Sequence, residues 1–123
     1  MKSSEVLIIE DDADVREMLC TMLEIRGWST ATAPDGKAGL ERLRTQCPDL
    51  ILCDIMMPDV DGFAVHDSVR ADSRLSGLPF VFVSAVMDSR LSGRLSTPHC
   101  SFVRKPFTLA QLEDAIRVAQ ERV

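Results

Sequence analysis

Five short apolar runs alternate with longer amphipathic segments along this chain. The apolar runs predict strands at residues 5–10, 28–32, 50–54, 80–84 and 102–104. The third and fourth runs, LILCD and FVFVS, are almost entirely apolar, as parallel strands buried on both faces require. The pattern therefore favours a parallel sheet over an antiparallel one.

The segments between the runs predict helices, of which the first and the last have the clearest pattern. The first, over residues 13–26, repeats apolar side chains at helical spacing, namely Val15, Met18, Leu19, Met22 and Leu23. The last is marked at its start by Thr108 and Gln111, which form a capping box. Phe107 can also pack on Leu112 as a hydrophobic staple, which fixes the start of this helix.

The other helices have weaker patterns. The second is expected to open after Asp35, and the third to bury Phe63, Val65 and Val69. The fourth, over residues 87–96, has only Leu91 and Leu95 as main core candidates, and Gly93 stands in the middle of it. We expect a helix there.

Alternating strands and helices predict a fold of the α/β class. Right-handed crossovers then give a doubly wound five-stranded parallel sheet, a three-layer sandwich with helices on both faces. A length of 123 residues with 46% hydrophobic content predicts a single domain over 1–123, with no output domain visible.

The charge and the cysteines exclude several classes of function. A formal net charge of -5 argues against a nucleic-acid surface, which needs clustered lysines and arginines. The four cysteines have neither the CxxC spacing of metal sites nor the density of a disulfide scaffold, so we expect reduced thiols. The apolar run at residues 6–9 is too short for a signal peptide or a membrane span. We expect a cytoplasmic protein with no membrane insertion.

Polar side chains gather at the carboxyl ends of the predicted strands, where doubly wound sheets bind ligands. They are Glu10, Asp11, Asp12, Asp54, Ser84 and Lys105. Carboxylates about 4 Å apart repel by about 4 kcal/mol per pair at an effective dielectric constant near 20, so this cluster does not serve stability. A divalent cation resolves the repulsion, and a few oxygen ligands with room left for water favour Mg²⁺.

Asp54 is the candidate nucleophile of this site. Beside a bound Mg²⁺ its carboxylate can attack a phosphorus atom in line, while Ser84 and Lys105 take up charge on the phosphoryl oxygens. The product is an aspartyl phosphate. The turn after Asp54 also frees a backbone carbonyl near Met56 as a further metal ligand.

Four motifs, LIIEDD, DIMMPDVDG, VSA and KPF, stand in an order that resembles the response-regulator receiver domains of two-component signalling. The resemblance covers essentially the whole chain. It implies a flavodoxin-like (βα)5 fold with strand order 2-1-3-4-5. It also implies a Mg²⁺ site made of the Glu10, Asp11 and Asp54 carboxylates and the Met56 carbonyl, with Asp54 as phosphoacceptor.

The same resemblance implies roles for three further residues. Ser84 would be the switch hydroxyl, Lys105 would contact the phosphoryl group, and Phe102, three residues before the lysine, would be the switch aromatic. Phe102 is equally readable as a core residue. The Lys105-Pro106 bond is expected to be cis, as is usual in this family.

Receiver domains are phosphorylated by partner proteins, so the resemblance also implies partners. A sensor histidine kinase or a phosphotransfer protein would donate the phosphoryl group, and a downstream effector protein or a fused output domain would respond. The protein would be a self-phosphorylating and self-dephosphorylating switch rather than a turnover enzyme. Met56 and Val86 place apolar side chains near the expected path of the hydrolytic water, which predicts slow loss of the phosphoryl group.

Departures from the family pattern keep an alternative open. The spacing from Ser84 to Lys105 is about one residue short, and Pro98-His99 replaces the usual Gly-Ala pair. The alternative is a phosphorylation-independent pseudo-receiver that acts as a protein-binding module. We also expect residues 87–96 to be mobile until phosphorylation or a partner orders them.

Simpler roles suit the neighbouring acids, and rival classes of protein fail at the site. Asp12 and Asp14 fit helix capping better than metal binding, and Asp59 and Asp61 fit turns. A flavin-binding protein of similar architecture needs a phosphate loop rich in Ser, Thr and Gly where three acids stand. A phosphatase of the haloacid dehalogenase type needs a second Asp at the position of Met56.

Overall fold

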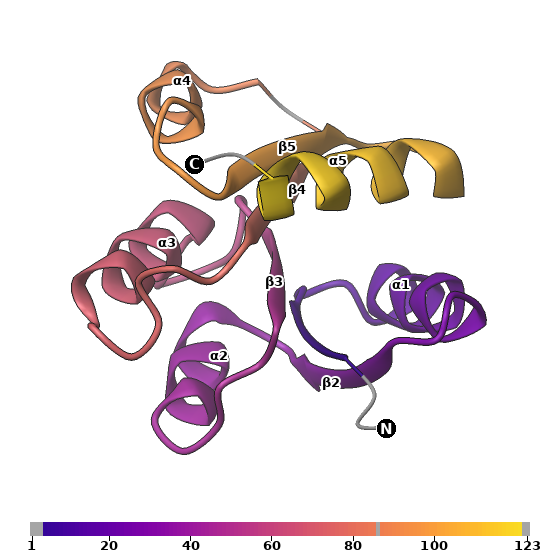
Figure 1. The fold of residues 1–123 in the computed structure, drawn as a ribbon, viewed down its shortest axis with the longest axis horizontal. Helices are drawn as coiled ribbons and strands as arrows, with labels where there is room; N and C mark the ends of the chain where they lie inside the picture. Colours follow the sequence, from indigo (N-terminus) through magenta and orange to yellow (C-terminus); the bar gives the residue numbers. More distant parts are fainter. Residues whose placement is uncertain (1–3, 86, 122–123) are drawn as a thin grey trace.

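The structure, a computed structural model, describes residues 4–85 and 87–121. Strands and helices alternate throughout (Figure 1). The strands are β1 (Glu5–Ile9), β2 (Ser29–Ala33), β3 (Leu50–Asp54), β4 (Phe80–Ser84) and β5 (Cys100–Arg104). The helices are α1 (Ala13–Ile25), α2 (Gly36–Leu43), α3 (Gly62–Ala71), α4 (Ser89–Leu95) and α5 (Leu109–Glu121).

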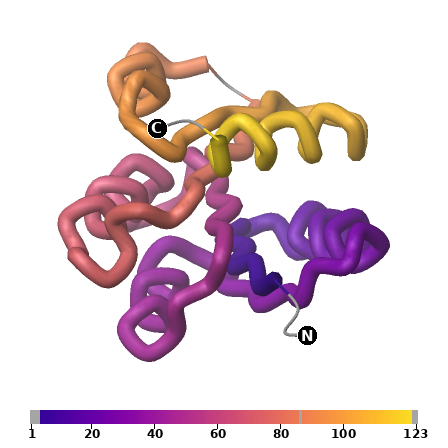
Figure 2. The backbone as a smooth tube through the Cα atoms, in the orientation of Figure 1, coloured from indigo at the N-terminus to yellow at the C-terminus, as the bar shows by residue number. Residues whose placement is uncertain are grey.

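The strands form one parallel sheet in the order β2-β1-β3-β4-β5, which confirms the predicted α/β class and strand order. Helices α1 and α5 cover one face, and α2, α3 and α4 cover the other (Figures 1 and 2). Successive residues of a strand point to opposite faces, so Leu7 and Ile9 enter one core while Val6 and Ile8 enter the other. Each layer of helices thus has its own apolar core.

The two most apolar strands agree with their predicted bounds, whereas β5 does not. It begins at Cys100, two residues before the prediction of 102–104. Ser101 explains the error, because a serine favours a loop in a sequence pattern. Here the Ser101 hydroxyl is buried and donates a hydrogen bond of 2.5 Å to the carbonyl of Ala115 in α5, which pays the desolvation cost. Strands β1 and β2 differ from their predictions by a single residue at their ends.

The predicted starts of α1 and α5 are confirmed by side-chain caps, and α1 ends at Ile25, one residue before its predicted end. Asp12 is the N-cap of α1, and its carboxylate accepts the N–H groups of Asp14 and Val15. At α5 the Thr108 and Gln111 side chains exchange hydrogen bonds with each other's backbone N–H groups, at 2.8 and 3.1 Å. Within α1, however, the side chain of Met18 is exposed although its spacing matched the core positions.

A regular helix forms in the segment with the weakest pattern. Helix α4 runs from Ser89 to Leu95, inside the expected range of 87–96, and Asp88 is its N-cap. Leu91 is fully buried, as expected, and Leu95 packs against the same core from a half-buried position.

The unusual Pro98-His99 pair is built into the fold as a left-handed turn. His99 has φ 58°, and its carbonyl accepts the N–H of Phe80 at 2.8 Å, next to the start of β4. The Arg70 guanidinium donates to the carbonyls of Pro98 and His99 and also to that of Leu78. The two loops that precede β4 and β5 are therefore held by one side chain.

In the described part of the chain, no helix has the length and apolar character needed to cross a membrane.

Candidate functional site

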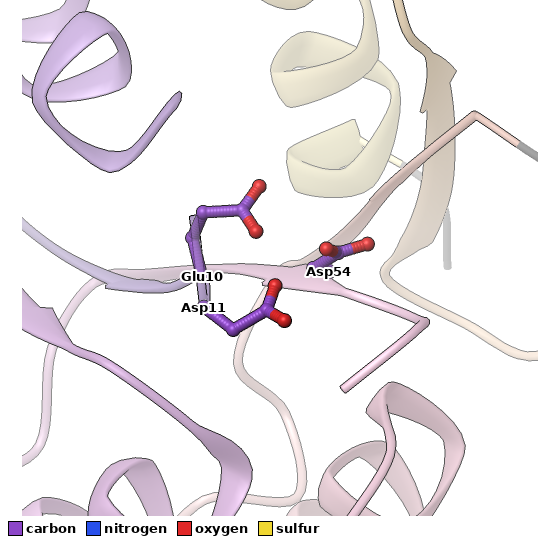
Figure 3. Close-up of side chains that lie close together, drawn as sticks. All are labelled: Glu10, Asp11 and Asp54. Carbon is purple, nitrogen blue, oxygen red and sulfur yellow. The ribbon is translucent and has the colours of Figure 1, made fainter. Parts of the chain in front are cut away.

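Three carboxylates meet at the carboxyl end of the sheet. Glu10 and Asp11 directly follow β1, and Asp54 is the last residue of the neighbouring β3. Figure 3 shows the three side chains directed toward a common space above the strand ends. One oxygen from each residue lies within 4.8 Å of the others, although Glu10 and Asp54 are buried and Asp11 is exposed. The topology thus gathers the acids expected from the sequence.

Lys105 reaches this cluster from the end of β5. Its Nζ lies 2.7 Å from Oε1 of Glu10 and 3.4 Å from Oδ2 of Asp54. Its backbone N–H donates to the Ser84 carbonyl at 2.9 Å, which ties the ends of β4 and β5 together. The Lys105-Pro106 bond is cis, as expected.

Burial and the neighbouring charges shift the pKa values of Glu10, Asp11 and Lys105. Burial raises the pKa of the Glu10 carboxyl, and the Asp54 carboxylate raises it further, against the opposite effect of Lys105. Burial, followed by the neighbouring Glu10, likewise raises the pKa of Asp11. Burial alone would lower the pKa of Lys105, but Glu10 and Asp54 outweigh it and the pKa is raised. One ammonium therefore does not balance the carboxylates.

Two residues that the sequence reasoning missed hold the loops of the site. The guanidinium of Arg16 in α1 donates to the Glu10 carbonyl at 2.8 Å, which fixes the backbone that carries the acidic pair. Gly62, the first residue of α3, packs against the backbone that follows β3: a Cβ there would lie 2.3 Å from the Asp54 carbonyl oxygen. The Asp-Gly pair that read as an ordinary turn thus carries a packing requirement, with Asp61 as the N-cap of α3.

The remaining predicted residues lie around this centre. Ser84 is buried at the end of β4, while the side chain of Met56 is 61% exposed on the loop after β3, so only its backbone is a candidate for the site. Phe102 is half-buried, packs on the core beneath β4 and β5, and lines a hollow together with Leu95. Val86 lies outside the described residues.

Histidines contribute nothing to the acidic cluster. His66 is buried in α3 against Phe80 and Phe82, and His99 lies in the turn before β5.

A parallel α/β sheet with acids and a lysine at its strand ends is the arrangement of a signalling receiver. The family model of the response regulator receiver domain matches residues 6–117, and the chain belongs to this family. A receiver domain is a switch in two-component signalling rather than a turnover enzyme, and histidine kinases are the partners of the family.

Individual relatives agree with this family. A probable transcriptional regulator, ycf27 of Galdieria sulphuraria, is 34% identical over 124 residues, which cover 99% of this chain and 47% of that protein. The chain thus spans about half the length of the curated relatives that it matches.

Solved structures show the same fold. A putative response regulator from Chloroflexus aurantiacus has a TM-score of 0.87 at 27% identity, and the match covers 98% of this chain and 100% of that one. The signal receiver domain of a histidine kinase from Syntrophus aciditrophicus has a TM-score of 0.84 at 27% identity, covering 96% of this chain and 90% of that one.

The close approach of Gly62 to Asp54 yields a prediction. In Gly62→Ala the added methyl group must displace the backbone that carries Asp54, so we expect a loss of about 1–3 kcal/mol in the free energy of unfolding, measured with urea. Gly77→Ala is the matched control, because a Cβ at Gly77 meets nothing within 4 Å. Equal stability of the two variants would contradict the packing argument.

The raised pKa of Glu10 yields a second prediction. The folded protein binds the proton of the Glu10 carboxyl more tightly than the unfolded chain does, so ionisation of Glu10 at neutral pH lowers the free energy of unfolding. With a chelator at pH 7, the free energy of unfolding of Glu10→Gln, measured with urea, should therefore exceed that of the wild type by on the order of 1 kcal/mol.

The sign of this difference sets its pH dependence. Because the stabilising effect of a protonated Glu10 is fully present only below its ordinary pKa of 4.5, the advantage of the variant should shrink as the pH falls toward that value. Glu17→Gln, which changes an exposed glutamate of α1, is the control. A variant less stable than the wild type at pH 7 would show that the pair of Glu10 with Lys105 outweighs the crowding.

Proposed function

We propose that this chain is a phosphoacceptor switch: a sensor histidine kinase, a phosphotransfer protein or a small phosphodonor transfers a phosphoryl group to Asp54 in the presence of Mg²⁺. The observation that carries the proposal is the acidic cluster with Lys105 against it, described above. The lysine contacts Glu10 and Asp54 at 2.7 and 3.4 Å, and an oxygen of each of the three acids lies within 4.8 Å of the others.

The donor set fits Mg²⁺. It offers hard oxygen ligands from Glu10, Asp11 and Asp54, and the exposure of Asp11 leaves access for water. We propose the backbone carbonyl of Met56 as a further ligand. When bound, the ion supplies positive charge that offsets the excess of carboxylates and that the phosphoryl oxygens require.

In the transfer step a carboxylate oxygen of Asp54 forms a bond to phosphorus while the bond from phosphorus to the donor atom breaks, and the donor keeps that electron pair. The Lys105 ammonium can stay close to the negative charge as that charge passes to the phosphoryl oxygens on Asp54, because it contacts both Glu10 and Asp54. Ser84, buried at the adjacent strand end, is proposed to donate its hydroxyl to a phosphoryl oxygen.

The response to phosphorylation is proposed to involve Ser84 and Phe102. An inward movement of Ser84 makes room for the half-buried Phe102 ring, which borders the hollow that Leu95 also lines. The aspartyl phosphate then shifts the population toward this arrangement, because it interacts better with it. A downstream effector or a fused output domain would read the changed surface, and the relatives described as transcriptional regulators favour an output in transcription.

The acceptor chemistry is tested by the intact mass of the protein after incubation with acetyl phosphate. We expect a phosphoryl adduct that requires Mg²⁺ and disappears in Asp54→Ala. Asp59→Asn is the control, because Asp59 is an exposed loop carboxylate at φ 65°, a conformation that asparagine tolerates. No adduct under any condition would overturn the proposal in favour of the phosphorylation-independent binding module.

The exposed Met56 side chain yields a prediction about the lifetime of the adduct. A thioether cannot orient the attacking water, so we predict slow loss of the phosphoryl group. Met56→Asn should accelerate the loss on the order of tenfold, which corresponds to about 1.4 kcal/mol in the barrier. The measurement is the decay of the adduct after removal of acetyl phosphate, with Met87→Asn, a second exposed methionine, as control. Equal decay rates would refute the role of Met56, and Val86→Glu tests the other expected position in the same way.

A further inference from the structure

Helix α4 is held against α3 largely by charged side chains. Of its seven residues, Leu91 is the fully buried one, and Figure 2 shows the short helix beside α3 at one end of the molecule. Arg90 and Arg94, one turn apart on α4, both stack on the buried ring of Phe63 in α3. Their guanidinium carbons lie 4.6 and 4.5 Å from the ring centre.

Arg94 also pairs with Asp67 of α3 through two parallel contacts. Its Nε and Nη2 donate to the two carboxylate oxygens at 3.1 and 2.6 Å. This pairing is the largest cause of the lowered pKa of Asp67. Asp67 in turn lies 3.0 Å from Nδ1 of His66, whose buried ring packs against Phe80 and Phe82 of β4. The contacts of Arg94 thus reach the strand that ends at Ser84.

Arg90 connects the loop that follows β3 with the loop that follows β4. It donates to both carboxylate oxygens of Asp88 at 3.1 and 2.8 Å, and it lies 3.7 Å from Asp61. Asp88 is the N-cap of α4, at the end of the loop that follows Ser84. Asp61 is the N-cap of α3, at the end of the loop that follows Asp54. One guanidinium therefore fastens the far ends of both loops.

We propose that Arg90 and Arg94 are positioning residues: with Phe63, Asp61, Asp67 and Asp88 they form an arginine latch that holds α4 and the ends of the loops after β3 and β4 in the unphosphorylated arrangement. The inference rests on the proposed function, because it concerns the movement that phosphorylation drives. Where a shift of Ser84 carries Asp88 with it, the contacts of Arg90 with Asp88 and Asp61 oppose that shift. The strength of the latch helps to set the ratio of the two arrangements before any phosphoryl group arrives.

The latch is tested with the phosphoryl mimic beryllofluoride in the presence of Mg²⁺. Opening the latch removes an interaction that favours the unliganded arrangement, so Arg90→Ala and Arg94→Ala should bind the mimic about three- to tenfold more tightly than the wild type. Amide hydrogen exchange over residues 89–95 should be faster in both variants. Arg94→Lys retains the charge without the two-pronged geometry, so it should fall between the wild type and Arg94→Ala.

The matched control is Arg117→Ala. Arg117 also pairs with two carboxylates, Asp114 and Glu121, but it does so on the exposed face of α5. Neither the affinity for the mimic nor the exchange of α4 should change in this variant. The side chains of Arg90 and Arg117 are exposed and that of Arg94 is partly exposed, and a thermal melt verifies that each variant is folded.

Each outcome decides the proposal. Faster exchange in α4 with unchanged affinity would overturn the positioning role and leave a purely structural contact. Unchanged exchange would overturn the latch itself. A wild-type protein that binds no beryllofluoride with Mg²⁺ would instead contradict the proposed function and with it the coupling, while the exchange of α4 would still decide whether the arginines hold that helix.

Discussion

The excess of negative charge at the carboxyl end of the sheet is the constraint on which the rest of this structure depends. Glu10, Asp11 and Asp54 face one ammonium, that of Lys105, and two of the three acids are buried. Such a cluster raises the free energy of the folded state, as the raised pKa of Glu10 reflects. The fold must therefore be stable enough elsewhere to hold the acids together.

That stability comes from the sheet and from contacts that hold the loops of the site. The strands β1, β3 and β4 are buried almost throughout, and two apolar cores sandwich them. Arg16 holds the backbone of Glu10, and Gly62 lets α3 approach the backbone of Asp54. Each of these contacts acts on the main chain, so the carboxylates themselves stay available for ligands. Rigid strands with locally fastened loops can hold like charges close together.

The sequence predicted those features that depend on local pattern, and missed those that depend on a distant partner. The strands at 50–54 and 80–84 and the capping box of α5 follow from neighbouring residues alone. The burial of Ser101 depends on the Ala115 carbonyl, and the need for Gly62 depends on the backbone of Asp54. Candidate site residues were found because strand ends converge in any parallel sheet. The contact of Arg16 with Glu10 has no comparable rule, because an arginine in a first helical turn reads as an ordinary surface residue.

The weak apolar pattern of α4 has a physical explanation in the way that helix is attached. Release of α4 from its neighbours would expose one fully buried large side chain, Leu91, at a cost of about 1.5–3 kcal/mol, and the arginine contacts can be exchanged for water. Release of α5 would expose Leu112 and Ile116 together with two alanines, at about twice that cost, and would also break the buried hydrogen bond from Ser101 to the Ala115 carbonyl. Of the two helices that border Phe102, α4 is therefore the one that can be released from the core at the lower cost. More buried apolar side chains would have made this helix easier to predict from the sequence and would have raised the cost of releasing it.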